Sequence, residues 1–373
     1  MVTNKYITRI ASVIMAAAVI LCLMASLFSD KLQEVYGNNA VTMKYESKLF
    51  STDQIMDIDI LMDEDDWNDM LENAISEEYY SCDVVVNGKT FYSVGIRPKG
   101  NTSLSSIVND PDTDRYSFKL EFDHYIEGQT CYGLDKLILN NNYADATNMK
   151  EAIVYDMYQY LGVDASLYNY AKISVNGDYR GVYLALEAVE DSFMLRNYGT
   201  EDGNLYKPEN MGVGGGMDGK DGDGWQMGEK PDGEDFPQKG EMPDGEDFPQ
   251  MGEAPNGEAA DIKMGIMGGN GGADLNYTDD DLDSYSTIWD GEITDSDKKD
   301  HKRVVEALKN ISEGTDLETY MDVDNILKYM AVHTFVVNDD SLSGTMAHSY
   351  YLYEYNGKLN ILPWDYNLSF GGM

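Results

Sequence analysis

The chain has 373 residues, enough to bury a full hydrophobic core, and we expect one large two-lobed domain with accessory segments. Its 27 lysines and arginines stand against 67 aspartates and glutamates, which gives a formal net charge of -40 at pH 7. A field of this sign repels the phosphates of nucleic acids and of anionic lipids. The composition therefore argues against a nucleic-acid partner and favours divalent cations and basic partners.

Residues 1–30 are the predicted membrane segment. Lys5 and Arg9 precede an apolar run at 10–28, which is long enough to span a bilayer. We expect an uncleaved anchor with its basic end in the cytoplasm, and a cleaved signal segment ending near Ala25 is the alternative. Either outcome exports the rest of the chain.

Three cysteines leave the redox state open. Cys22 lies inside the apolar run, so only Cys82 and Cys131 remain for the exported body. They can form a disulfide in an oxidising compartment or stay as two buried free thiols.

Strand patterns dominate residues 50–210, the predicted first lobe. The predicted strands are 55–60, 82–86, 90–96, 117–122, 136–139, 171–175 and 179–189. Asn87-Gly88 and Asn176-Gly177 join two pairs of these strands, and Asn-Gly is the strongest short signal of a two-residue hairpin.

Two helices are predicted within the same lobe. The first covers 64–73 behind the N-cap Asp63, and the second runs from its cap Asn148 to Leu161, where Gly162 ends it. Apolar spacing in the second helix predicts a stripe that faces the core, formed by Met149, Ile153, Met157 and Tyr160.

Charged residues in this lobe each allow two interpretations. The basic loop 97–103, with Lys99, can cradle phosphate or be an ordinary turn. Lys119 shares the outer face of its strand with Glu121, so it can reach into a cleft or face solvent. Glu151 lies in the first turn of its helix, where a favourable helix-dipole charge explains it adequately. Glu187 interrupts an apolar run and requires a partner.

The composition changes at residues 211–281 to glycine, aspartate, glutamate, methionine and proline. Low hydrophobicity and high negative charge predict a disordered insertion. Its aspartates between glycines match a calcium-binding loop only incompletely. Helices are then expected at 297–310 and 317–337, in a second lobe of residues 286–373. The apolar positions expected to pack this lobe are Ile326, Leu327, Met330, Ala331 and Phe335.

The most informative stretch is the predicted hairpin formed by strands 350–355 and 358–362, which Asn356-Gly357 joins. Polar residues gather at its open end: Asn338, Asp339 and Asp340 before the first strand, and Asp365 and Asn367 after the second. One turn can bring both sets together. Such carboxylates suit a divalent cation and a base beside a metal-bound phosphate, or they are acidic loops that face water.

Several motifs together resemble the CotH family of spore coat protein H-like atypical kinases. These motifs are Arg97-Pro98-Lys99-Gly100-Asn101, Ser117-Phe118-Lys119, Asn176 to Tyr183, Asn338-Asp339-Asp340-Ser341 and Leu362 to Asn367. The resemblance implies an α+β, atypical protein kinase-like fold with an antiparallel-sheet N-lobe and a helical C-lobe. It also implies ATP with Mg²⁺ or Mn²⁺ as cofactors.

The resemblance assigns a role to each candidate residue. Asp340 is the catalytic aspartate that accepts a hydroxyl proton, and Asp365 binds the metal. Further assignments are Lys119 as the strand lysine that neutralises phosphate, Glu151 as its helix partner, Lys99 as a phosphate contact, Glu187 to Val189 as the hinge, and Ser349 or Asn367 as ligands of a second metal.

The implied activity is transfer of the ATP γ-phosphoryl group to serine or threonine hydroxyls of secreted, spore-coat or cell-surface proteins. Two departures support an inactive, structural or adhesive scaffold as the alternative. Ser349 stands where the family tends to have asparagine, and serine is the weaker metal ligand. The chain also stops at Met373, just after the metal motif, so we expect a C-lobe that lacks helices.

Overall fold

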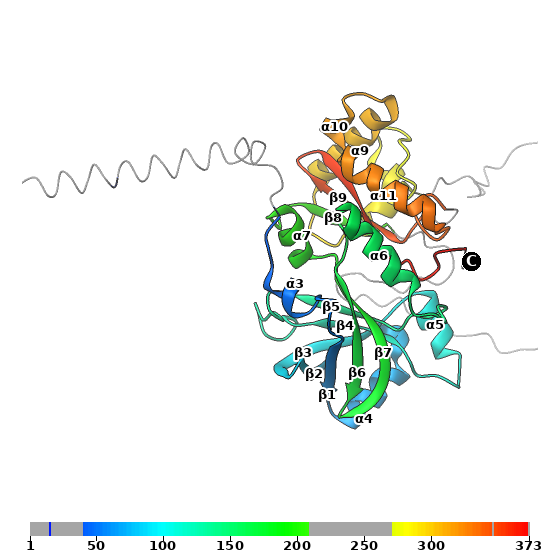
Figure 1. Ribbon diagram of the computed structural model, residues 1–373. Helices are drawn as coiled ribbons and strands as arrows, with labels where there is room; N and C mark the ends of the chain where they lie inside the picture. Colours follow the sequence, from blue (N-terminus) through cyan, green and yellow to red (C-terminus); the bar gives the residue numbers. More distant parts are fainter. Residues whose placement is uncertain (1–14, 16–39, 209–270, 345–346, 372–373) are drawn as a thin grey trace, which may run out of the picture. The chain divides into compact units, whose positions relative to one another are not determined.

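Alternating strands in the first half of the chain close into a barrel. The computed structural model describes residues 40–208, 271–344 and 347–371, together with Met15 (Figure 1). The predicted membrane segment, apart from Met15, and the predicted insertion up to residue 270 lie outside the described residues. Within the described part, no helix is both long and apolar enough to cross a bilayer.

The barrel has the strand order β1-β2-β3-β4-β5-β7-β6. Its strands are β1 Met56–Leu61, β2 Tyr80–Val86, β3 Lys89–Lys99, β4 Ser117–Glu121, β5 Lys136–Asn140, β6 Tyr168–Val175 and β7 Asp178–Glu187. Both predicted Asn-Gly hairpins are confirmed, since Val86 pairs with Lys89 and Val175 with Asp178. The sheet is not purely antiparallel as we expected, because β1 pairs with β6 in parallel and so closes the barrel.

Short helices accompany the barrel strands. They are α3 Lys44–Lys48, α4 Glu64–Glu72, the 3₁₀ turn Ala74–Ser76, α5 Thr102–Val108, α6 Lys150–Leu161 and α7 Asp191–Tyr198. Asp63 caps α4 as predicted, by accepting a hydrogen bond from the Asp65 N–H at 2.9 Å. Asn148 does not cap α6, since Met149 occupies that position and Asp145 Oδ2 accepts from the Lys150 N–H at 2.9 Å.

A second sheet and the remaining helices form the rest of the described chain. The strands have the order β10-β9-β8. These elements are β8 Asn204–Tyr206, the 3₁₀ helix Leu282–Tyr285, α8 Ser286–Trp289, α9 Lys298–Glu313, α10 Leu317–Tyr320, α11 Val323–Val336, β9 Tyr350–Tyr355 and β10 Lys358–Pro363. The single helix predicted at 317–337 is two helices, because Asp322 caps a new start by accepting from the Asn325 N–H at 3.2 Å.

Order resumes earlier than the composition predicts. Ala273 is fully buried, and its carbonyl oxygen accepts a hydrogen bond from the Tyr350 hydroxyl at 2.6 Å. Ala273 therefore packs with the β9 strand, and Leu275 and Tyr277 pack against the core, although the acidic composition places them in the predicted insertion.

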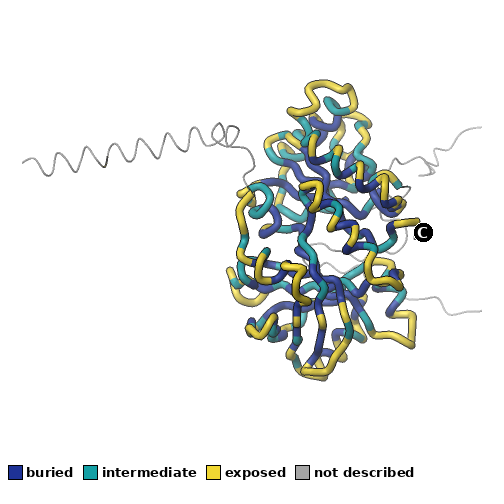
Figure 2. The backbone as a smooth tube through the Cα atoms, viewed as in Figure 1, coloured by how far each residue is buried: buried dark blue, intermediate teal, exposed yellow. Residues whose placement is uncertain are grey.

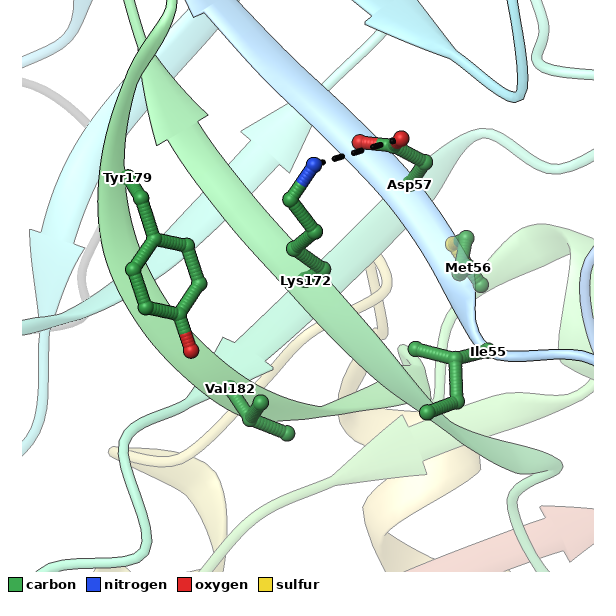
Figure 3. Close-up of a pocket in the computed structure, with 6 residues that line it drawn as sticks. All are labelled: Ile55, Met56, Asp57, Lys172, Tyr179 and Val182. Carbon is green, nitrogen blue, oxygen red and sulfur yellow. Dashed lines mark ion pairs between the residues drawn. The ribbon is translucent and has the colours of Figure 1, made fainter.

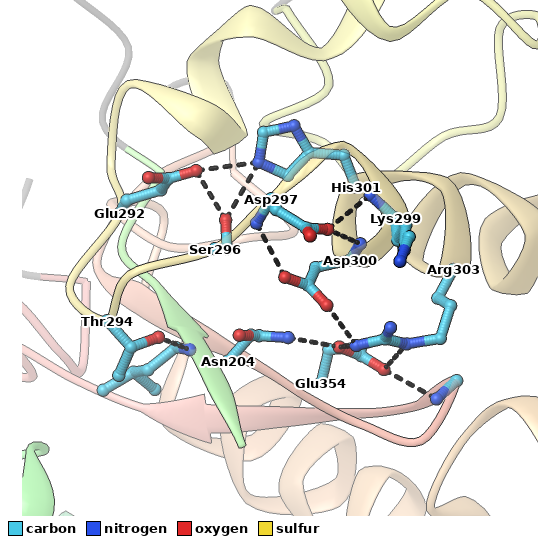
Figure 4. Close-up of polar contacts among 12 residues, drawn as sticks. Asn204, Glu292, Thr294, Ser296, Asp297, Lys299, Asp300, His301, Arg303 and Glu354 are labelled. Carbon is cyan, nitrogen blue, oxygen red and sulfur yellow. Dashed lines mark hydrogen bonds and ion pairs between the residues drawn. The ribbon is translucent and has the colours of Figure 1, made fainter. Parts of the chain in front are cut away.

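Glu354 ties α9 to the second sheet (Figure 4). This fully buried carboxylate of β9 accepts from Arg303 Nε at 2.8 Å and from Asn204 Nδ2 at 2.7 Å. It also accepts from the Gly357 N–H at 2.6 Å, which fixes the turn of the β9–β10 hairpin. Since all its partners are donors, the buried charge is compensated.

Two hydrophobic cores lie in the described residues (Figure 2). One fills the barrel, around residues such as Ile58 and Leu120, and the other joins α6, α9 and α11 to the second sheet. Cys82 and Cys131 belong to the barrel core as free buried thiols, so the free-thiol alternative is the correct one. Burial raises the pKa of each thiol to about 12, which makes both unreactive at neutral pH.

Most of the predicted core stripe of α6 is wrong. Met157 is partly buried against the core, but Met149, Ile153 and Tyr160 are 52, 40 and 88% exposed, whereas Tyr155 and Tyr158 are fully buried. Both faces of this helix carry apolar residues, so periodicity alone could not select the buried one.

The α11 stripe fails in the same way. Leu327 and Phe335 are 63 and 70% exposed, while Tyr329, Val332 and His333 are buried; Ile326 and Met330 are partly buried against the core.

A hollow of about 520 Å³ lies on the outside of the barrel (Figure 3). Its lining residues are Ile55, Met56, Asp57, Lys172, Tyr179 and Val182. None of them is a candidate site residue, so the hollow is separate from the acidic groups described next.

Candidate active site

The two acidic segments meet at the open end of the β9–β10 hairpin. Its register matches the prediction, with Tyr355 opposite Lys358 and Tyr350 opposite Pro363. Asn338, which follows α11, donates through Nδ2 to the carbonyl oxygen of Asp365 at 3.3 Å. The predicted meeting of the two segments is therefore confirmed.

Asp340 is held by the two residues that precede β9. It is 9% exposed; His348 Nε2 lies 2.8 Å from its Oδ1, and Ser349 Oγ donates to its Oδ2 at 3.2 Å. Both carboxylate oxygens thus have a partner that orients them. The hydroxyl of Ser349, a metal ligand by resemblance, is directed at Asp340.

Asp365, which is half-buried, and Glu151, which is 2% exposed, form a pair of interacting acids. Burial and the Asp365 carboxylate raise the pKa of Glu151 to about 8, although Lys99 opposes this shift. Burial also raises the pKa of Asp365; Lys99 lowers it, Asp340 raises it, and Lys207 and His348 lower it. Two interacting carboxylates disfavour the charged form of both, so a cation bound there would favour their ionisation.

Two buried oxygens near this pair lack hydrogen-bond donors among the described residues. Asn140 Nδ2 donates to Glu151 Oε2 at 2.7 Å, and the Tyr366 backbone N–H also favours the charged form of the Glu151 carboxyl. Neither Glu151 Oε1 nor Asn338 Oδ1 has a donor in good hydrogen-bond geometry in the described part of the chain. Buried acceptors without donors suit a hard cation, which takes oxygen ligands. The side chains of Asp365, Glu151 and Asn338 therefore fit magnesium in their donor chemistry.

Protein side chains alone do not complete such a centre. Within the described ranges, no group of three or more histidines, cysteines, aspartates or glutamates is arranged to hold a metal ion. Magnesium commonly binds through one or two carboxylates and takes waters and substrate phosphates as its other ligands. The second predicted ligand, Asn367, donates through Nδ2 to the Tyr143 carbonyl oxygen at 3.2 Å.

Backbone strain is concentrated around these groups. Val337, Ser349 and Asp365 have φ values of 49°, 58° and 55°, in the left-handed region. Val337 is β-branched, for which this conformation is a genuine outlier. Strain of this kind costs about 1 to 3 kcal/mol per residue and is typical of functional sites.

Lys119 does not pair with Glu151, contrary to the resemblance. Its Nζ lies 2.7 Å from Glu190 Oε1, and Lys136 forms an ion pair with the other oxygen of Glu190. Burial alone would raise the pKa of Glu190, but these two lysines lower it to about 2. On the outer face of β4 and β5, Lys119 therefore pairs with Glu190, the residue after the predicted hinge. The lysine that interacts with Glu151 is Lys99 of β3.

Glu187 is a structural residue of the hinge. Its fully buried carboxylate accepts from Arg196 Nη2 at 2.6 Å, from Tyr45 at 2.5 Å and from the Leu167 N–H at 3.0 Å. Its own N–H donates to the Leu167 carbonyl oxygen at 2.9 Å. The expected partner is therefore Arg196, and both the side chain and the N–H of Glu187 have partners within the protein. The backbone contact with adenine that the resemblance assigns to the hinge stays a prediction. Val189, the other hinge residue, is 1% exposed.

The predicted phosphate loop is divided by the structure. Arg97 and Lys99 both belong to β3. Arg97 is 4% exposed and forms an ion pair with Glu77, and its guanidinium lies 5.4 Å from the centre of the Tyr79 ring. Lys99 Nζ lies 5.5 Å from the centre of the Trp364 ring, beside the Asp365 segment. Of the two cations, only Lys99 therefore lies at the acidic site.

Sequence reasoning missed Glu190, Lys136 and Lys207. The register of the strands could have identified Lys136. It lies directly opposite Glu121 on the antiparallel strands β4 and β5, and Glu121 is two positions from Lys119. No pattern distinguishes Lys207, which follows β8 and acts on Asp365 from far away in the sequence.

A family model described as CotH kinase protein matches residues 96–373, a range that contains Lys99, Glu151, Asp340 and Asp365. No curated protein sequence matches the chain.

Proposed function

Because the chain belongs to the CotH kinase protein family, we propose that it transfers the γ-phosphoryl group of ATP to serine or threonine hydroxyls of exported proteins. The observation that carries the proposal is the meeting of the Asp340 and Asp365 segments, where Asn338 donates to the Asp365 carbonyl oxygen and the Asp340 carboxylate acts on Asp365. A spore-coat or cell-surface setting follows from the family and from the apolar N-terminal run.

Asp340 is the residue that accepts the proton of the acceptor hydroxyl. It lies in the catalytic loop, which we define as residues 338–344, and His348 and Ser349 fix the orientation of its carboxylate. A base held in one orientation can stay within hydrogen-bonding reach of the hydroxyl.

Asp365, Glu151 and Asn338 are the residues that would hold magnesium. We call residues 364–370 the metal segment. A bound magnesium ion would supply neutralisation of the charge on the phosphate oxygens. Ionised Glu151 and Asp365 are needed for this role, and Lys99 favours their ionisation. Lys99 is also our candidate for the phosphate contact, in place of Lys119.

The nucleotide base would lie against the chain that follows β7. The N–H groups of Glu187 and Ala188 donate to the carbonyl oxygens of Leu167 and Lys136, so we assign the backbone contact with adenine to Val189. Lys119 and Glu190 lie next to the hinge as an ion pair, which suits a role in shaping the nucleotide site.

The experiment is incubation of the exported body with labelled ATP, Mg²⁺ and candidate acceptor proteins. We expect magnesium-dependent label transfer that Asp365→Ala abolishes. Transfer that persists unchanged in this variant would refute the proposal.

A non-catalytic scaffold is the second candidate, favoured by one observation. The Ser349 hydroxyl donates to the Asp340 carboxylate, which is the group that would accept the substrate proton. Ser349 is therefore not available as a further metal ligand. A thermal shift with ATP and Mg²⁺ separates the candidates: its absence supports the scaffold, and its presence supports the kinase.

A further inference from the structure

A buried chain of polar side chains connects the catalytic loop to the metal segment. The hydroxyls of Tyr158 and Tyr366 lie 2.6 Å apart, and the Tyr366 hydroxyl lies 3.3 Å from His333 Nδ1. On the other side of the imidazole, His333 Nε2 lies 2.5 Å from Ser343 Oγ. Tyr158, Tyr366 and His333 are at most 2% exposed, and only Ser343 reaches the surface.

Stacking holds the imidazole in place. The Tyr329 ring is parallel to His333 within 9°, at 5.5 Å between centres, and it stacks in the same way on Tyr158 at 5.9 Å. Its hydroxyl lies 3.3 Å from Ser341 Oγ, in the catalytic loop. The ring of His333 therefore has little freedom to turn away from either hydrogen-bond partner.

The chemistry of a neutral imidazole fits both contacts. Burial lowers the pKa of His333, although the Asp339 carboxylate opposes this, so the neutral form prevails at neutral pH. Neutral histidine has one donor nitrogen and one acceptor nitrogen. Along the chain from Tyr158 through Tyr366 and His333 to Ser343, each group can donate to the next in one direction. Every hydrogen bond therefore has one donor and one acceptor in either tautomer of His333.

We propose that His333 is a positioning residue that fixes the catalytic loop relative to the metal segment. It touches neither substrate nor cofactor, and it acts through Ser343 on the one side and Tyr366 on the other. Asp340 lies three residues before Ser343, and Asp365 is adjacent to Tyr366. The inference rests on the proposed kinase function, since it assigns those two aspartates their roles.

The expected effect is on turnover, because His333 sets the distance between two groups that act in the same step. A misplacement of about 1 Å can cost about 100-fold in rate. Ser343 is exposed, so its substitution should disturb the fold less than a change at the buried His333.

The kinetic test uses Ser343→Ala, His333→Phe and the double variant. Phenylalanine keeps the stacking on Tyr329 but loses both hydrogen bonds. We expect each single variant to lower kcat about tenfold or more with the KM for ATP nearly unchanged, and the double variant to fall no further than His333→Phe. Ser312→Ala is the matched control, because this exposed serine donates only within α9, to the Lys309 carbonyl oxygen at 2.7 Å.

Amide hydrogen exchange gives a readout that needs no activity. The Ser369 N–H donates to the Tyr366 carbonyl oxygen at 3.1 Å, on the far side of His333 from Ser343. We expect Ser343→Ala to speed exchange at Ser369, whereas Ser312→Ala should not. A merely local role for Ser343 would leave the Ser369 amide unchanged.

The outcomes separate the two claims. Unchanged Ser369 exchange in Ser343→Ala overturns the positioning role, as does an additive loss of kcat in the double variant. If the wild-type chain transfers no phosphate to any acceptor, the kinase proposal fails, and the exchange measurement alone then decides whether His333 couples the two segments.

Discussion

Replacing the buried Glu151 by glutamine removes the titrating carboxyl that interacts with Asp365 and keeps its shape. The glutamine carbonyl can still accept from Asn140, and the neutral amide removes the electrostatic repulsion by Asp365. We expect Glu151→Gln to stabilise the metal-free and nucleotide-free protein, because a buried carboxylate without a full set of donors is costly to ionise.

The size of the effect follows from the pKa of Glu151, raised from 4.5 to about 8. Below pH 4.5 the carboxyl is protonated in both the folded and the unfolded chain, so it adds no penalty. As pH rises from 4.5 to about 8, only the unfolded chain ionises freely, and the folded state loses about 1.4 kcal/mol of stability per pH unit. The variant should therefore gain about 3 kcal/mol at pH 7.

The assay is urea denaturation at pH 5, 7 and 8.5, without nucleotide or metal. The advantage of Glu151→Gln should be small at pH 5, large at pH 7 and level above pH 8. Glu306→Gln, an exposed substitution on α9, gives the baseline for the same chemical change. An advantage that does not vary with pH would refute the account of the interacting acid pair.

Three further predictions concern the described chain. Arg196→Met should cost about 3 to 5 kcal/mol in denaturation, because it leaves the buried Glu187 carboxylate without its cationic partner, and a loss below 1 kcal/mol would contradict this. Val337→Asn should raise stability by roughly 1 kcal/mol, because asparagine tolerates the left-handed conformation better, and a lower melting temperature would count against it. Lys99→Met should weaken magnesium–ATP binding at least about tenfold in calorimetry, and more than Lys119→Met does. Equal losses in the two variants would show that Lys119 also contacts the phosphate.

Hairpins were predictable because their information is local. Asn-Gly pairs select two-residue turns, and each turn then fixes the register of its strands. The hairpin at Asn356-Gly357 accordingly gave the correct pairing down to Tyr350 and Pro363, and with it the meeting of the two acidic segments.

Helix faces and charge partners were less predictable, since both depend on tertiary structure. In α6 the buried face carries tyrosines and Glu151, so it reads as more polar than the exposed face with Ile153. The partner of Lys119 depends on where the chain after β7 places Glu190, which no local pattern contains. The resemblance paired Lys119 with Glu151, whereas the geometry pairs Lys119 with Glu190 and brings Lys99 to Glu151.

The central claim is that Asp340 and Asp365 perform different parts of one phosphoryl transfer. The most direct measurement compares Asp340→Asn and Asp365→Asn for magnesium-dependent ATP binding by calorimetry and for single-turnover transfer of labelled phosphate. We predict that Asp365→Asn loses both, whereas Asp340→Asn keeps binding and loses transfer by at least about 100-fold. Equal transfer by Asp340→Asn and the wild-type chain would contradict the account.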